Sequence, residues 1–286
     1  MTLDAVFSKD GTIINYYRMG QGAGIVLLHG SMESAKSHLK LAEALSDSFT
    51  VYLPERRGHH LEGSSNYSMQ KEVEDLHVLL TKTGAQYVFG VSSGGLICLQ
   101  AALKLPSIQK IAVYEPALIL EGSISTDFLP RYEKELAQGN IAAALVTAMK
   151  GARLGPPLFN AIPRRLIESL TNVSMKKEDK KARNGDITMR MLAPTLRYDF
   201  QLITEMAERL EAFRDIKADV LLLSGHKSPA WLRAALAPLK NTLPHVKWVD
   251  FPGLDHGGSS DKSATNRGGN PEVVAAEMKA FFKDAC

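Results

Sequence analysis

Cysteine is scarce in this chain. Its 286 residues include two cysteines, Cys98 and Cys286, which cannot build a disulfide framework. The Cys-x-x-Cys and His-Glu-x-x-His spacings that are typical of metal centres are also absent. We therefore expect neither a disulfide-stabilised scaffold nor a metal site, and no motif in the sequence indicates a cofactor.

Long apolar runs and a large excess of one charge sign are missing too. No apolar run approaches the ~18 residues of a membrane-spanning helix, and the formal net charge is +3. The most charged stretch, residues 175–181, mixes both signs and is typical of a solvated helix face. The amino terminus lacks the basic and apolar segments of a signal peptide. These features favour a cytoplasmic protein that binds neither nucleic acid nor membranes.

What the chain does contain is an alternation of strand-like apolar runs with helical segments. The apolar runs are residues 24–28, 49–53, 85–89, 108–114, 220–223 and 246–251. This alternation favours an α/β fold with a mostly parallel central sheet flanked by helices. Turn residues 9–11 separate two further strand-like runs and predict a hairpin, and a closing helix is predicted at residues 271–283.

The alternation stops between the strand that ends near residue 115 and the strand that starts near residue 219. The intervening residues are helical in composition, and the clearest helices are predicted at 141–152 and 201–213. Long insertions of this kind often form active-site lids. We therefore expect a helical cap (lid) domain at residues 117–215, over a core domain made of residues 1–116 and 216–286.

Residues 90–94 read Gly-Val-Ser-Ser-Gly and lie between a strand-like run and a helical run. In a sharp strand-to-helix turn, the central Ser92 is held in a strained backbone with its hydroxyl exposed above the sheet. Gly90 and Gly94 suit such a turn because side chains there would collide across it. The motif predicts Ser92 as a nucleophile.

A serine hydroxyl is a weak nucleophile, so Ser92 needs a base within hydrogen-bond reach and a third group that orients the base. His256 directly follows the last predicted strand and comes after Ser92 in the expected chain order. A surface histidine in a polar loop is the alternative interpretation. We predict His256 as the base.

The third group is harder to place. Its usual position in this chain order is the loop after the penultimate strand, but residues 224–230 contain no carboxylate. Glu115 ends the strand that follows the serine helix, and parallel strands bring their carboxyl ends to one edge of a sheet. We predict Glu115 as the orienting acid, with Pro116 favouring an extended backbone there. Asp250, Asp255 or no acid at all remain alternatives.

The negative charge that develops on a carbonyl oxygen needs two aimed N–H donors. The turn geometry makes the backbone N–H of Ser93 one of them. The loop after the first parallel strand supplies the other; we expect it to be Ser31, with Met32 as second choice, and Gly30 beside them to contact substrate. His29, which precedes this loop, is expected to be structural.

The succession of His29-Gly30, the serine motif at residues 90–95 and His256 resembles the α/β-hydrolase superfamily. The resemblance covers nearly the whole chain, and it implies the α/β-hydrolase fold with residues 117–215 as the cap.

Ser228 stands where members of this superfamily commonly have an aspartate. This departure resembles members whose acid has moved to the end of the strand after the nucleophile helix. Zearalenone lactone hydrolases are similar, because they pair a Gly-x-Ser-Ser-Gly turn with a glutamate after that strand. Ser92 and Glu115 match both positions, so the resemblance implies a Ser-Glu-His triad.

These features predict a cofactor-free serine hydrolase that cleaves a carboxylic ester or lactone of a small, largely apolar substrate through an acyl-enzyme. Apolar side chains of the cap are expected to bind this substrate together with Gly30 and Met32. They are Leu129, Tyr132, Leu154, Leu158, Met189, Met191 and Leu192. A C–C bond hydrolase or lyase on the same triad, and a slow-turnover receptor-like binding protein, are alternatives. The sequence indicates neither the substrate nor the oligomeric state.

Overall fold

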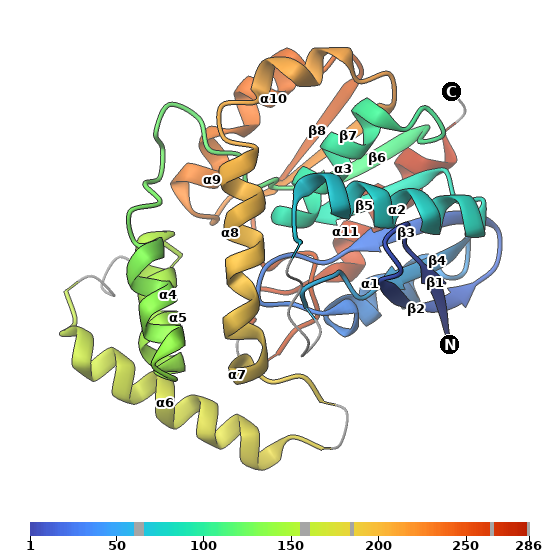
Figure 1. The fold of residues 1–286 in the computed structure, drawn as a ribbon. Coiled ribbons are helices and arrows are strands. Elements are labelled where there is room, and N and C mark those ends of the chain that lie inside the picture. Colours follow the sequence, from blue (N-terminus) through green and yellow to red (C-terminus); the bar gives the residue numbers. More distant parts are fainter. Residues whose placement is uncertain (60–65, 155–160, 184–185, 264–265, 285–286) are drawn as a thin grey trace.

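The computed structural model describes residues 1–59, 66–154, 161–183, 186–263 and 266–284. An eight-stranded sheet forms its centre, with helices against both faces (Figure 1). The strands are β1 (Thr2–Phe7), β2 (Ile13–Gly20), β3 (Ala23–Leu28), β4 (Phe49–Pro54), β5 (Tyr87–Val91), β6 (Lys110–Tyr114), β7 (Asp219–Gly225) and β8 (Val246–Phe251).

The strands follow the order β1-β2-β4-β3-β5-β6-β7-β8. The first two contacts along this order are antiparallel and the remaining five are parallel. The predicted hairpin is confirmed by the β1–β2 pair, and Gly11 in its turn has a φ of 85°, which glycine tolerates without strain.

The central strands are buried on both faces, which explains their continuous apolar runs. One apolar cluster packs the sheet against α2, α3 and α10, and a second packs the opposite face against α1 and α11. The helices outside the β6–β7 connection are η1 (Ala35–His38), α1 (Leu39–Leu45), α2 (Met69–Thr83), α3 (Ser93–Lys104), α9 (Ala230–Ala234), α10 (Leu236–Thr242) and α11 (Pro271–Lys283).

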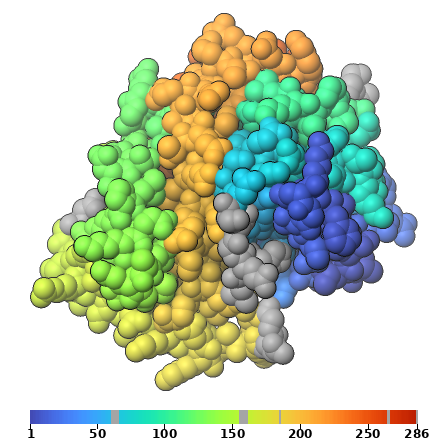
Figure 2. Space-filling model, viewed as in Figure 1, coloured from blue at the N-terminus to red at the C-terminus, as the bar shows by residue number. Residues whose placement is uncertain are grey.

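The described part of the connection between β6 and β7 forms helices and no strand. These are α4 (Leu129–Ala137), α5 (Ile141–Gly151), α6 (Arg164–Lys181), α7 (Met189–Leu192), η3 (Ala193–Thr195), α8 (Leu196–Glu205) and η4 (Leu210–Asp215). Figure 1 shows α8 between the α4–α5 pair and the sheet, and Figure 2 shows these helices as one side of the molecule. The expected fold class is therefore confirmed, while the division into core and cap domains stays a prediction.

The helix predicted at residues 201–213 is wrong in its bounds. Helix α8 begins earlier and ends at Glu205, and η4 follows after a break. Glu208 in the break has a φ of 58°, which a continuous helix does not permit, and its N–H donates to the carbonyl of Ile119 at 3.0 Å. Apolar spacing runs through this break, so periodicity alone does not reveal it.

Five of the six charged residues at positions 176–181 of helix α6 are exposed and Glu178 is half-buried, as expected of a solvated helix face, whereas Met175 is fully buried. Within the described ranges, no helix combines the length and apolar character that crossing a bilayer requires.

The parallel strands bring their carboxyl ends to one edge of the sheet. There β3 leads into the loop of Ser31, β5 into Ser92, β6 into Glu115 and β8 into the loop of His256. Edges of this kind are where α/β proteins bind ligands. The topology therefore gathers the residues singled out from the sequence.

Candidate active site

Ser92 lies in a sharp turn between β5 and α3. Its φ of 55° falls in the left-handed region, where a side chain strains the backbone. A Cβ on Gly90 would lie 2.4 Å from the carbonyl oxygen of Gly94, and a Cβ on Gly94 would lie 2.6 Å from that of His29. A side chain at Gly90 would therefore collide across the turn, as predicted, whereas one at Gly94 would collide with the backbone at the end of β3.

A short hydrogen bond joins His256 to Glu115, with Nδ1 donating to Oε2 at 2.7 Å. Glu115 is fully buried, whereas a quarter of the His256 side chain (25%) is exposed. The other carboxylate oxygen, Oε1, accepts the backbone N–H of Gly225 at 2.7 Å. The carboxylate thus keeps the imidazole proton on Nδ1 and leaves Nε2 as the nitrogen that can accept a proton.

The backbone at Glu115 differs from the expectation. Pro116 favours an extended residue before it, yet Glu115 has a φ of 44°. Its N–H donates to the carbonyl of Leu223 at 3.0 Å, and its carboxylate bonds to Gly225 and His256. The expectation of an extended backbone was wrong because these long-range contacts outweigh the local preference.

The two rival carboxylates bond elsewhere. Asp250 accepts one hydrogen bond from the Ser224 hydroxyl at 2.7 Å and another from the His226 ring at 3.1 Å. Asp255 accepts the backbone N–H two residues further on, at 3.0 Å. Among the described residues, no hydrogen bond joins either carboxylate to His256. The geometry favours the glutamate after β6.

Ser31 and Ser93 lie next to each other, with their hydroxyl oxygens 3.5 Å apart. Ser93 is the first residue of α3, so its N–H is one of those at a helix start that no helix carbonyl accepts. Met32 has a φ of 60°. Three of the six described non-glycine residues with positive φ, Met32, Ser92 and Glu115, therefore belong to this site, as is typical of functional centres.

A buried ionic network lies against Ser93. Nη1 of Arg56 donates to the Asp199 carboxylate and to the Ser93 hydroxyl, both at 3.1 Å. Nη2 of Arg56 donates to Glu72 at 2.9 Å. The Ser93 hydroxyl in turn donates to Asp199 at 2.7 Å. Because Asp199 belongs to α8, the network ties the inserted helices to the residue that follows Ser92.

For Asp199 and Arg56, neighbouring charges shift the pKa in the direction opposite to the effect of burial. Burial raises the pKa of Asp199, but the charges of His59 and Arg56 outweigh it and hold that pKa below its ordinary range. Burial lowers the pKa of Arg56, but Glu72 and its other acidic neighbours have the larger effect. The net result is a pKa above the ordinary value. Burial, with the charges of His59 and Arg56, lowers the pKa of His29. His29 is therefore neutral, and its Nε2 accepts the backbone N–H of Arg56 at 3.3 Å.

Replacing Asp199 by alanine is expected to reduce the free energy of unfolding by about 3–5 kcal/mol, because it leaves the Arg56 charge buried without one partner. Urea unfolding near neutral pH measures this. The control is Asp179→Ala, which breaks a pair with Arg190 whose side chains are 34% and 36% exposed; it should cost less than about 1 kcal/mol. Equally small losses in both variants would argue against a stabilising network.

Two cavities share Ser92 and His256 in their walls. The smaller one, which we call the chamber, has a volume of about 130 Å³. The inserted helices and the loop before them supply its apolar wall, including Ile124, Phe128, Leu145, Met149, Leu196 and Phe200. The larger one, which we call the hollow, measures about 940 Å³ and has both polar and apolar walls.

Four of the predicted substrate-binding residues lie at these cavities. Met32 and Leu154 line both, and Gly30 and Met189 line the hollow. Leu158 lies outside the described residues.

The other four predicted substrate-binding residues line neither cavity. Leu129 packs against the apolar core, and Tyr132 is fully buried with its hydroxyl donating to the carbonyl of Ala193 at 2.7 Å. Leu192 is buried and Met191 is one of the exposed apolar residues. The composition of the insertion could not show which face of each helix turns toward the site.

Sequence reasoning missed most of the chamber wall. The missed residues on two helices repeat at the spacing of a single helix face. They are Leu145, Ala148 and Met149 on α5 with Ala152 directly after it, and Leu196, Phe200 and Ile203 on α8. This periodicity can be read from the sequence and could have identified these residues as one face of each helix.

The described residues contain no group of three or more histidine, cysteine, aspartate or glutamate side chains arranged to hold a metal ion. Cys98 is buried on α3, and burial raises the pKa of its thiol. Cys286 lies outside the described residues.

Known proteins resemble the chain over most of its length. The model of a family described as the Alpha/beta hydrolase family matches residues 25–276. The crystal structure of an alpha/beta hydrolase from Sphaerobacter thermophilus aligns with a TM-score of 0.78 and 28% identity, covering 98% of this chain and 100% of that chain.

Two curated relatives are more distant or shorter matches. The uncharacterized hydrolase YraK of Bacillus subtilis is 33% identical over 116 residues, which span 38% of this chain and less than half (43%) of YraK. The 2-(acetamidomethylene)succinate hydrolase of Mesorhizobium japonicum is 25% identical over 249 residues, which span 85% of this chain and 84% of the relative.

Proposed function

Because the chain belongs to the alpha/beta hydrolase family, we propose that it is a serine hydrolase that cleaves a carboxylic ester or lactone through an acyl-enzyme. The observation that carries this proposal is the 2.7 Å hydrogen bond between Glu115 and His256, which lines the same two cavities as a serine on a strained turn. It supports Ser92, His256 and Glu115 as nucleophile, base and orienting acid, which is the arrangement of zearalenone lactone hydrolases.

In the first half of the reaction, the Ser92 hydroxyl oxygen attacks the carbonyl carbon while Nε2 of His256 takes its proton. Glu115 stabilises the imidazolium that forms. The carbonyl oxygen becomes an oxyanion, which accepts hydrogen bonds from the backbone N–H groups of Ser31 and Ser93. The intermediate then collapses, the alkoxide leaves with the proton from His256, and the acyl group stays on Ser92.

In the second half, His256 takes a proton from water, and the hydroxide attacks the acyl carbon. The same two amides stabilise the second oxyanion. Its collapse releases the carboxylic acid, and His256 returns the proton to the Ser92 oxygen. Every step uses side chains and backbone amides of this chain together with water.

The chamber supports a short apolar acyl group. Its volume of about 130 Å³ is close to that of an engineered apolar cavity of ~150 Å³ that binds benzene, so a group of about six carbons fills it. The alcohol part of the substrate extends into the hollow. In this proposal residues 117–215 act as a cap whose helices select the acyl group.

Among p-nitrophenyl esters, we expect kcat/KM to peak at butyrate or hexanoate and to fall about tenfold or more at decanoate, because longer chains exceed the chamber. Leu145→Ala enlarges the chamber and should move the optimum to longer chains. Met191→Ala, outside both cavities, is the control and should leave the optimum in place. A profile that rises steadily through decanoate in the wild type would rule out the chamber as the acyl site.

One observation favours a second candidate, a substrate that carries carboxylates. Arg153 and Lys227 line the hollow beside Ser92 and His256, and the relative from Mesorhizobium japonicum is named as a hydrolase of a substituted succinate. Under this alternative, anionic esters or amides should give a higher kcat/KM than neutral esters of equal size.

Other chemistry on the same residues is separated by product analysis. Ester cleavage yields a carboxylic acid and an alcohol, whereas a C–C bond hydrolase yields an acid and a product newly protonated on carbon, and a lyase consumes no water. A receptor-like binding protein would show a large ligand-induced Tm shift with at most one slow turnover.

A further inference from the structure

Another histidine–carboxylate pair, largely shielded from solvent, lies beside the site and has no part in the reaction described above. Glu33 directly follows the Ser31 loop, and His38 ends η1. Nε2 of His38 lies 3.1 Å from Oε2 of Glu33, and the two side chains are 1% and 18% exposed. The pair therefore lies next to the proposed oxyanion loop.

Glu33 holds the Ser31 loop in its shape. Its Oε2 accepts the backbone N–H of Gly30 at 2.8 Å, so the carboxylate closes the turn that contains Ser31. Met32 in this turn has a φ of 60°. Strained backbone persists only where surrounding contacts determine it. The position of the Ser31 amide therefore depends on Glu33.

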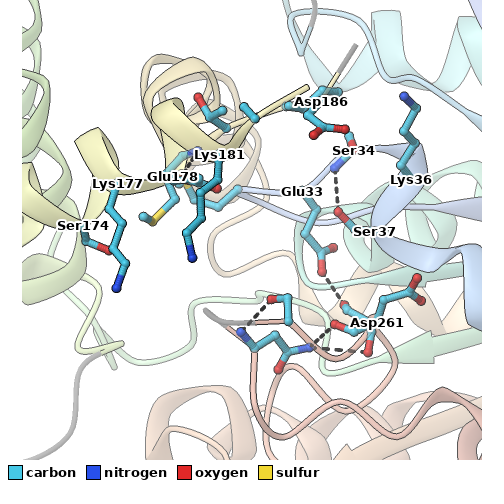
Figure 3. Close-up of a pocket in the computed structure, with 18 residues that line it drawn as sticks. Glu33, Ser34, Lys36, Ser37, Ser174, Lys177, Glu178, Lys181, Asp186 and Asp261 are labelled. Carbon is cyan, nitrogen blue, oxygen red and sulfur yellow. Dashed lines mark hydrogen bonds between the residues drawn. The ribbon is translucent and has the colours of Figure 1, made fainter. Parts of the chain in front are cut away.

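The same pair also reaches the loop after β8, which carries the proposed base. The Ser260 hydroxyl donates to Oε1 of Glu33, and Nδ1 of His38 donates to the backbone carbonyl of Ser259 at 3.3 Å. Figure 3 shows Glu33 pointing toward the loop that carries Asp261. Glu33 and His38 thus join the loop of the proposed oxyanion donor to the loop of the proposed base.

The contacts of the His38 ring define its charge. Ser259 offers a carbonyl and Glu33 a carboxylate, so both ring nitrogens donate and His38 is an imidazolium. Burial lowers the pKa of His38, but the Glu33 charge outweighs it and raises that pKa above the ordinary value. Burial raises the pKa of Glu33, but His38 and the hydrogen bonds lower it to about 2. Asp261 also faces His38, and Phe89 packs edge-on against its ring.

We propose that Glu33 and His38 are positioning residues, whose ion pair fixes the oxyanion loop relative to the base-bearing loop without touching the reacting atoms. The proposal rests on the proposed hydrolase function. Oxyanion donors act on charge that develops in the transition state and not on the bound substrate. Loosening the pair should therefore lower kcat and leave KM almost unchanged.

The test compares Glu33→Gln and His38→Gln with the wild type. We expect kcat for p-nitrophenyl butyrate to fall about 10- to 100-fold, because a displaced oxyanion donor is worth up to ~10²–10³ in kcat, and KM to stay within about threefold. Inactivation by a fluorophosphonate, which also needs the oxyanion hole, should slow in parallel. His226→Gln is the matched control, because it breaks an exposed histidine–carboxylate pair with Asp250; it should change neither rate.

Ser260→Ala is a milder variant that keeps the ion pair and removes one bond from Glu33 to the base-bearing loop. It should lower kcat severalfold in a folded protein, so the test holds even if a pair variant fails to fold. Wild-type kcat in folded His38→Gln or Ser260→Ala, with or without a lower Tm, would overturn the proposal. A wild type that reacts with neither ester nor fluorophosphonate would instead reject the proposed function.

Protonation gives an independent readout. In ¹H–¹⁵N spectra at about pH 6.5, where a histidine with the ordinary pKa is half protonated, His38 should carry protons on both ring nitrogens in more than half of the molecules. Its contribution to stability is complete below that ordinary value and is lost as the pH rises through its raised pKa. The kcat of the wild type should fall as the pH rises through that raised pKa, and His38→Gln should lack this fall. A His38 ring that is mostly neutral at about pH 6.5 would refute the ion pair.

Discussion

Replacing Ser92 by alanine is expected to lower kcat for ester hydrolysis on the order of 10⁶-fold, leaving only the residual catalysis that the oxyanion donors and substrate binding supply. Without the hydroxyl no acyl-enzyme forms, and His256 has no nucleophile to activate. The substitution keeps the Cβ in the strained turn, so the fold should be retained. Steady-state hydrolysis of p-nitrophenyl butyrate, with a thermal unfolding curve as a check of folding, measures the effect.

Ser46→Ala is the matched control for this loss. The Ser46 hydroxyl donates to the backbone carbonyl of Glu43 at 2.8 Å in an exposed position, so its removal should leave turnover at the wild-type level. If Ser92→Ala also retained turnover, the nucleophile would have to be another group.

Replacing Glu115 by glutamine is expected to lower kcat by about 10⁴-fold, the size of effect seen when an orienting acid becomes an amide. Because the other carboxylate oxygen accepts the N–H of Gly225, the glutamine side chain would keep its oxygen there and turn its NH₂ toward Nδ1 of His256. Nδ1 would then have to accept a hydrogen bond, which places the imidazole proton on Nε2 and prevents proton uptake from Ser92. Fluorophosphonate inactivation should slow along with kcat.

Asp250→Asn separates this effect from a general loss of negative charge. Asp250 is the rival carboxylate, and it bonds to Ser224 and His226 instead of His256. We expect its removal to leave kcat within about threefold of the wild type, in line with an exposed pair that contributes little. A large loss in Asp250→Asn together with near-normal Glu115→Gln would move the acid to β8.

Much of the fold and the centre of the site could be predicted because their signals are local. Continuous apolar runs mark strands buried on both faces, and two glycines around Ser92 mark a turn that tolerates no Cβ. Glu115 needed one further step, since its place followed from the shared edge of parallel strands. Chain order and sheet topology together predicted that Glu115 would lie within hydrogen-bond reach of His256.

The surroundings of the site could not be predicted, because their contacts join distant parts of the chain. Asp199 meets Ser93 across 106 positions, and Ser260 meets Glu33 across 227. No local pattern marks either pair. Tyr132 shows the same difficulty, since an aromatic residue in the insertion suits a substrate pocket, yet its hydroxyl is bonded within the protein. A buried tyrosine hydroxyl takes whichever partner the packing offers.

The most direct test of the central claim, that Ser92 is the nucleophile served by His256 and Glu115, is to locate a fluorophosphonate adduct by peptide mass spectrometry. We expect a single adduct on Ser92 in the wild type, much slower labelling in Glu115→Gln, and none in Ser92→Ala. An adduct on Ser31 or Ser93, or rapid ester hydrolysis by a protein that takes up no label, would contradict the claim.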